Sequence, residues 1–133
     1  MNMALQDRQK RGFKRFLRSF GYACQGLKHV VKNEQNMQIH LVIAATTLMA
    51  AWILSFSLTS WMILLLVIAG MFSMEIMNTA VERTVDMITD DYHPLAKRAK
   101  DIAAAAVFVY CLFAAIIGLM LFLPPLLELW LLL

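Results

Sequence analysis

The sequence predicts an all-α membrane protein with three membrane-spanning helices, preceded by an amphipathic helix at the membrane surface. Of its 133 residues, 61% are hydrophobic and only 16% are charged, whereas soluble domains average about 45 to 50% apolar residues. Residues 35–74 contain no Asp, Glu, Lys or Arg, and the basic residues fall in two blocks, one before residue 33 and one over residues 83–100. This composition excludes a soluble domain. The length predicts that the chain forms a single membrane domain.

The surface helix is predicted over residues 10–33. Aromatic and aliphatic residues recur there at helical spacing, and Lys and Arg occupy much of the opposite side, which is typical of a helix lying on anionic lipid. A helix packed only against its own protein remains an alternative. The segment lacks the short apolar core and small-residue cleavage site of a secretory signal peptide.

Three spans follow, over residues 39–56, 61–88 and 95–123. Eighteen residues reach about 27 Å, just enough for the first span to cross a bilayer. A hairpin turn is predicted at 57–60, with Trp61 as an interfacial anchor. A polar break precedes Pro94, which suits the first turn of the third helix.

The third span is expected to stop at Pro124 and Pro125. Because Lys and Arg near membrane ends are retained inside, both basic blocks and the N-terminus should face the cytoplasm, with the C-terminus outside. The tail 126–133 is expected in the outer interface. Cys24 and Cys111 are expected to be free thiols.

Four polar residues form a stripe on the second span: Glu75, Asn78, Glu82 and Asp86. At about 100° per residue, the last three lie within about 60° of Glu75 around the helix axis. Glu75 is closest to the apolar segment, and desolvation favours its neutral form, as a general base near neutral pH needs. Glu82 and Asp86 are placed to bind a hard cation such as Mg²⁺ together with phosphate oxygens. The pattern favours phosphoryl chemistry on a lipid.

A structural seam is the alternative, since polar side chains also hydrogen-bond between membrane helices. Several acids on one face without an intramembrane Lys or Arg argue against it, because such charges would repel. Acids in a membrane helix usually mark a functional surface.

Residues outside the stripe are weaker candidates. Glu34 ends the surface helix at the predicted depth of Glu82 and could complete a cation site, or could be an ordinary charged helix end. Lys100 could meet phosphate or be a snorkelling lysine; Tyr92 and His93 could line a nucleotide pocket, although a His before Pro is often a cap. The sequence has no phosphate-loop motif, protein-kinase signature or Cys/His metal cluster, so a nucleotide site would be unconventional.

Several short motifs together resemble the bacterial diacylglycerol kinase and undecaprenol kinase family. The resemblance covers about residues 12 to 120, and the combination is more specific than its E-x-x-N-x-x-x-E core alone. The matching segments are Gly21-Tyr22, Gly26-Leu27, Asn33-Glu34-Gln35-Asn36, Met74 to Glu82, Val85-Asp86, Tyr92 to Ala96 and Ala99-Lys100-Asp101.

This resemblance implies a homotrimer with active sites shared between subunits, in which Mg-ATP phosphorylates a lipid hydroxyl at the cytoplasmic side of the bacterial cell membrane. It implies that Glu75 is the general base, that Glu34 and Glu82 bind Mg²⁺, and that Asn78 lies near the reaction centre with Asp86 in a supporting part. The positions implied to contact ATP are Arg15, Tyr22, Glu34, Glu82, Asp91, Tyr92, His93, Lys100 and Asp101. No nucleic-acid partner is expected.

The Glu34-Gln35-Asn36 and Ile39-His40 stretches and the His-Pro pair are more similar to Gram-positive undecaprenol kinases, so undecaprenol is the expected substrate and diacylglycerol the alternative. Gln38 stands where many members carry Arg, so the headgroup contacts are not carried over. From a different class, a small cation or proton transporter would need carboxylates across the whole bilayer, yet Glu128 is the only acid expected outside. An assembly protein with a polar seam is a third alternative.

Overall fold

Four helices make up the part of the chain that the computed structural model describes, residues 12–89 and 91–131 apart from the Lys14 side chain. They are α2 (Phe13–Asn33), α3 (Gln35–Ile53), α4 (Leu58–Ile88) and α5 (Pro94–Leu131), and no strand occurs in these residues. The chain forms two compact units, of which the first ends at Glu34 and the second begins at Gln35. The all-α class is confirmed, and the single domain stays a prediction.

The first unit contains α2, which corresponds to the predicted surface helix; residues 10 and 11 of that prediction lie outside the described range. The side chains of Phe13, Phe16 and Phe20 are exposed, and the rings of Phe13 and Phe16 stack with centroids 6.4 Å apart. Glu34, in an extended conformation, ends α2 and donates its backbone N–H to the Val30 carbonyl.

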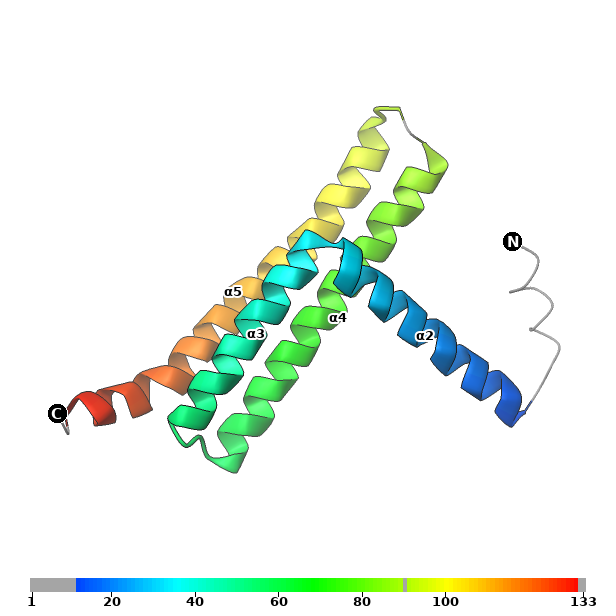
Figure 1. Cartoon of the computed structure of the whole chain (residues 1–133). Helices are drawn as coiled ribbons and strands as arrows, with labels where there is room; N and C mark the ends of the chain where they lie inside the picture. The colour runs from blue at the N-terminus through cyan, green and yellow to red at the C-terminus, as the bar shows by residue number, and fades with distance from the viewer. Residues whose placement is uncertain (1–11, 90, 132–133) are drawn as a thin grey trace. The chain divides into compact units, whose positions relative to one another are not determined.

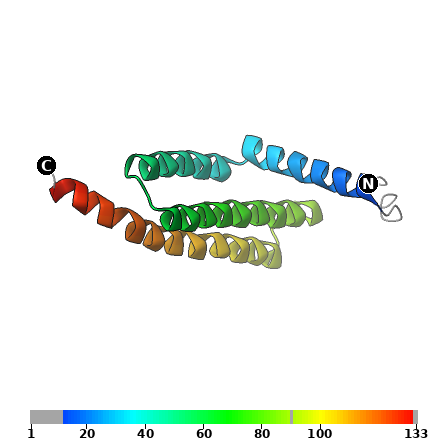
Figure 2. The same ribbon diagram turned by 90° about the horizontal axis from the view of Figure 1, so that it is seen from below.

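In the second unit, α3, α4 and α5 lie side by side with alternating direction (Figures 1 and 2). All three are long and apolar enough to cross a membrane. With about 1.5 Å rise per residue, the 19 residues of α3 extend about 28 Å and the 31 residues of α4 about 46 Å. Since the hydrocarbon core of a bilayer is about 30 Å thick, α4 must continue beyond it. The ends of α4 and α5 nearest residues 89–93 extend past the start of α3 in both views.

Buried residues follow a seven-residue spacing on two of these helices. On α3 they are Met37, Ala44 and Ala51, and on α4 Leu64, Met71 and Asn78 are spaced in the same way. A seven-residue repeat keeps one helix face against a neighbour at a shallow crossing angle. In α5, by contrast, no described residue is buried.

The turn between α3 and α4 lies three residues before its predicted position at 57–60. Ser55 has φ of 52°, and the N–H groups of Ser55 and Phe56 donate to the carbonyls of Trp52 and Ala51, each at 3.1 Å. This is a Schellman motif, which ends a helix when one residue adopts the left-handed conformation. The first span therefore ends at Ile53 and not at residue 56.

Ser57 starts the next helix earlier than predicted. Its Oγ accepts a hydrogen bond from the N–H of Ser60 at 3.2 Å, the standard interaction of a serine N-cap. The polar residues Thr59 and Ser60 thus form the first turn of α4, which begins at Leu58 and not at residue 61. The prediction that residues 57–60 form a turn is wrong.

The prediction that the third helix stops at residue 123 is also wrong. The helix α5 continues through Pro124 and Pro125 to Leu131. A proline removes one backbone hydrogen bond and kinks a helix, but a leucine-rich segment on both sides can keep the helix going. The ribbon of α5 bends toward its C-terminal end (Figure 1).

Gly70 allows the closest approach between α4 and α5. The hydroxyl of Tyr110, on α5, donates to the backbone carbonyl of Val67 at 2.9 Å, and this places the tyrosine ring over Gly70. A methyl group added at Gly70 would overlap the ring, with Cε2 only 2.9 Å away. Next to this contact, the thiol of Cys111 lies 3.6 Å from the sulfur of Met71.

Gly70→Ala should therefore destabilise the protein. The added methyl forces Tyr110 away from the Val67 carbonyl, and overpacking of this kind costs about 1 to 3 kcal/mol. The midpoint of thermal unfolding in detergent measures the loss. Gly118→Ala is the matched control, because a methyl there meets nothing within 4 Å. Equal midpoints for the two variants would contradict the tight contact at Gly70.

Candidate active site

The polar stripe on α4 runs from a buried to an exposed position. Glu75 is 2% exposed and Asn78 6%, Glu82 is half-buried, and the Asp86 side chain is 54% exposed. Successive members are three or four residues apart, so they share one side of the helix. One helix face thus leads from a buried acidic residue to an exposed one.

Glu75 is the most buried ionisable residue in the part of the chain that the structure describes. Its carboxyl group makes no hydrogen bond or ion pair with any described residue. Burial of an ionised carboxylate without a partner is costly, so a neighbouring proton donor would be bound strongly at this position. A hydroxyl group brought to Glu75 can supply that proton.

Asn78 and Glu82 form a pair one turn further along. The Asn78 amide nitrogen donates to Glu82 Oε1 at 2.9 Å, which holds the carboxylate in one orientation. The other end of the amide, Oδ1, is buried and has no hydrogen-bond partner among the described residues. A buried polar atom without a partner is uncommon and calls for a ligand or ion.

These oxygens fit a magnesium ion. Mg²⁺ prefers hard oxygen ligands and is often held by one or two carboxylates together with substrate phosphates. Glu82 supplies a carboxylate, and the unpartnered oxygen of Asn78 lies one turn away. Within residues 12–89 and 91–131, no three acidic, His or Cys side chains gather at one point, so these groups alone do not form a closed metal cage.

Asp86 joins the stripe to α5 through an ion pair with Lys100. This places a lysine from α5 beside the exposed end of the α4 stripe. A second pair connects Lys97 and Asp101 within α5, with 2.5 Å between Nζ and Oδ2. Asp101 is therefore held by its own helix.

The loop residues Asp91, Tyr92 and His93 are exposed beside these pairs. The backbone N–H of Asp91 donates to the hydroxyl of Thr89 at 3.1 Å. His93 Nδ1 accepts from the N–H of Leu95 at 3.2 Å, so this histidine caps α5, as its place before Pro94 suggested. Its Nε2 has no part in the cap.

The structure brings together Asn78 with Glu82 and Asp86 with Lys100, all in the second unit. Arg15, Tyr22 and Glu34 belong to the first unit. Arg15 and Tyr22 lie on exposed positions of α2, and Glu34 is half-buried at its end.

Sequence reasoning missed Thr79, which is 5% exposed next to Asn78. Its place beside the stripe was the available signal, although a threonine in an apolar helix often bonds only to its own backbone. A cavity between α3, α4 and α5 was also missed, because its lining comes from three separate spans.

The geometry defines a multi-span membrane protein in which the 31-residue helix α4 carries an oxygen-rich site toward one end. A model of the prokaryotic diacylglycerol kinase family matches residues 21–122. The chain therefore belongs to the prokaryotic diacylglycerol kinase family, which confirms the resemblance found in the sequence. It is a lipid kinase of a bacterial membrane, and kinases use ATP as co-substrate.

Three relatives show the breadth of the similarity. An undecaprenol kinase from Bacillus subtilis is 48% identical over 84% of this chain and 91% of its own length. A diacylglycerol kinase from Synechocystis is 38% identical over 84% of this chain and 64% of its own length. A diacylglycerol kinase from Escherichia coli K12 is 33% identical over 79% of this chain and 86% of its own length.

Asp86→Asn and Lys100→Met should both lower kinase activity, Lys100→Met more strongly because it also removes the ammonium group, and the double variant should be no worse than Lys100→Met alone. The reason is that each change removes the same cross-helix pair, so the effects are not additive. Exposed ion pairs contribute little to folding, so the thermal midpoints should barely change. Additive losses in kcat/KM for ATP would show that the two residues act independently.

Proposed function

We propose that this chain phosphorylates undecaprenol at the cytoplasmic face of the membrane, with Mg-ATP as the phosphoryl donor. The observation that carries the proposal is the buried Glu75 on the same helix face as the Asn78–Glu82 pair. The 48% identity to an undecaprenol kinase supports the choice of lipid.

In the proposed reaction, the lipid hydroxyl lies at Glu75. The Glu75 carboxylate accepts the hydroxyl proton as the oxygen attacks the γ-phosphorus of ATP, and the bond from that phosphorus to the bridging oxygen breaks, so ADP leaves. The ammonium group of Lys100, oriented by Asp86, is placed to contact phosphate oxygens. Glu82, oriented by Asn78, would hold the magnesium ion with Glu34, and the ion would offset charge on the phosphates.

The proposed orientation places the N-terminus and the 89–93 loop in the cytoplasm. Lys and Arg accumulate on the cytoplasmic side of membrane proteins, and both basic blocks of this chain lie at those segments. The exposed phenylalanines and the basic residues of α2 support its location at the membrane surface. Arg15, Tyr22, Asp91, Tyr92, His93 and Asp101 are proposed to contact ATP.

A homotrimer with shared active sites is proposed on the basis of the family resemblance. Cross-linking in native membranes and mass measurement of the detergent-solubilised protein would test this. Mixing two inactive variants, one altered in α2 and one in α4, tests the sharing, since restored activity requires that different subunits supply the two halves.

Diacylglycerol is the second candidate substrate, since relatives with 38% and 33% identity are named diacylglycerol kinases. The experiment that separates the candidates presents purified protein with Mg-ATP and each lipid in the same mixed micelles. A kcat/KM that is higher for undecaprenol supports the proposal. A higher value for diacylglycerol replaces it.

Glu75→Gln should lower kcat by about 10²- to 10⁴-fold, the usual contribution of a general base, while the protein remains folded. The amide keeps the shape of the side chain but cannot accept the proton. Radiolabelled phosphate transfer from ATP to lipid measures the loss. Glu128→Gln, an exposed acid near the other end of α5, is the control and should keep its activity. Near wild-type turnover by Glu75→Gln would remove Glu75 from the role of base.

Glu82→Gln and Glu34→Gln should each shift the magnesium titration of activity to higher concentration, because each removes one carboxylate from the ion. Activity measured against free Mg²⁺ at fixed ATP gives the half-saturating concentration. Glu128→Gln serves for comparison, since this exposed acid near the other end of α5 is not proposed as a ligand. An unchanged titration for both glutamate variants would count against their role as ligands.

A further inference from the structure

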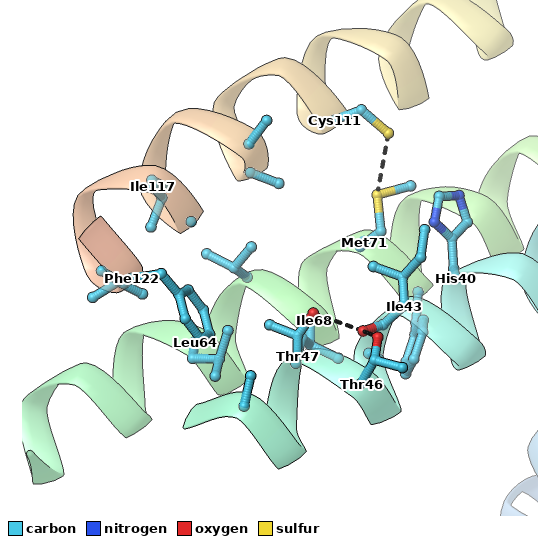
Figure 3. Close-up of a pocket in the computed structure, with 18 residues that line it drawn as sticks. His40, Ile43, Thr46, Thr47, Leu64, Ile68, Met71, Cys111, Ile117 and Phe122 are labelled. Atoms are coloured by element: carbon cyan, nitrogen blue, oxygen red, sulfur yellow. Dashed lines mark hydrogen bonds between the residues drawn. The ribbon is translucent and has the colours of Figure 1, made fainter. Parts of the chain in front are cut away.

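A cavity of about 670 Å³ lies between α3, α4 and α5, inside the membrane-crossing part of the second unit (Figure 3). His40 and Met71 lie toward one end of it, and Leu64 and Phe122 toward the other. At the latter end, the rings of Phe122 and Phe56 pack with centroids 4.7 Å apart. The cavity is thus elongated along the helices, with the ring of Phe122 at the end remote from Met71.

The cavity continues the face of α4 that carries Glu75. Met71, Ile68 and Leu64 precede Glu75 by four, seven and eleven residues, and each lies within about 40° of it around the helix axis. All three line the cavity. A molecule with its hydroxyl at Glu75 and its chain along this face would therefore enter the cavity directly.

Polar groups in the lining do not make the surface polar. The hydroxyls of Thr46 and Thr47 donate to backbone carbonyls of their own helix, at 2.9 Å and 2.6 Å from the Ile43 oxygen. Their donors are satisfied, and the remainder of the lining is almost wholly aliphatic, aromatic or sulfur-containing, with His40 at one end. The cavity suits a hydrocarbon and offers little to a polar ligand.

Small residues make this space wide. Ala44, Ala50 and Ala114 line it together with Gly118, and a methyl group added at Gly118 would meet no atom within 4 Å. The side branches of a methyl-branched chain need such width.

We propose that this cavity binds the first isoprene units of a polyprenol and thereby selects the prenyl chain of the substrate. The inference rests on the proposed function, because it places the prenol hydroxyl at Glu75. Gly118 lies seven residues beyond Cys111, which contacts Met71, so it lies roughly 10 Å deeper along the chain path. A short prenol ends before Gly118 and a longer one passes it.

The test uses Gly118→Leu in the full-length protein and measures kcat/KM with prenols of increasing length, starting from the shortest that the unaltered protein phosphorylates. The leucine projects into the cavity and blocks the deeper part. We expect kcat/KM to be unchanged for the shortest prenol and to fall by about tenfold once the chain is long enough to reach Gly118, mainly through KM. Ala50→Leu, on the opposite wall, should give the same dependence on length.

Ala45→Leu is the matched control, because this residue of α3 is exposed, lies five residues before Ala50 and does not line the cavity. It should leave the whole series unchanged. Equal loss for all chain lengths, or loss of the oligomer in both cavity variants, would show that the cavity is filled by another copy of the chain and would overturn the proposal. An equally steep fall for dioctanoylglycerol would overturn the selection of prenyl chains.

These outcomes are separate from a failure of the proposed function. If the protein phosphorylates undecaprenol, depends on Glu75, and yet shows no length-dependent loss in Gly118→Leu, the function holds and the cavity proposal fails. If it phosphorylates no prenol, both fail together.

Discussion

The burial of the Glu75 carboxyl group inside a membrane-crossing helix is the constraint on which the rest of the structure depends. A buried ionised acid is costly unless it is paired, and Glu75 has no described partner that offsets this cost. The apolar surroundings must therefore supply the stability, and they do so through a long, strongly hydrophobic α4 that packs against both α3 and α5. Polarity then increases along one face, through the Asn78–Glu82 pair to the exposed Asp86.

The contact of Tyr110 with Gly70 fixes the register in which α4 and α5 meet. Tyr110 bonds to the Val67 carbonyl and Cys111 contacts Met71, and ten residues before Tyr110 on α5 Lys100 meets Asp86. The helices are antiparallel, and on both of them the Lys100–Asp86 pair lies nearer to residues 89–93 than the contacts of Tyr110 and Cys111 do. A close apolar contact within the membrane thus positions a charged pair at its surface. An interaction between exposed charges alone would be too weak to hold that alignment.

The sequence predicts this architecture well where the signal is local. The charge-free residues 35–74 indicate the spans, and helical spacing alone places Glu75 and Asp86 on one face. The helix ends could not be predicted in the same way, because residue types do not reveal the backbone geometry there. Ser55 adopts a left-handed conformation that is more usual for glycine, and Pro124 and Pro125 remain within α5. The Gly70 contact and the cavity join residues far apart in the chain, and a single sequence has no periodicity that reports such pairs.

The proposed reaction brings together a lipid-soluble and a water-soluble substrate. Because α4 is longer than the hydrocarbon core is thick, its polar face can contact both of them. A lipid alcohol keeps its chain in the hydrocarbon core, where Met71, Ile68 and Leu64 line the cavity. ATP stays in water, where Asp86 and Lys100 lie exposed or half-exposed. Asp86 lies eleven residues after Glu75, which is roughly 16 Å along the helix. A single helix therefore extends from the hydrocarbon core of the membrane into the aqueous phase. A loop in this position would leave unpaired backbone groups in the membrane, which explains why the site is built on a helix that continues past the bilayer.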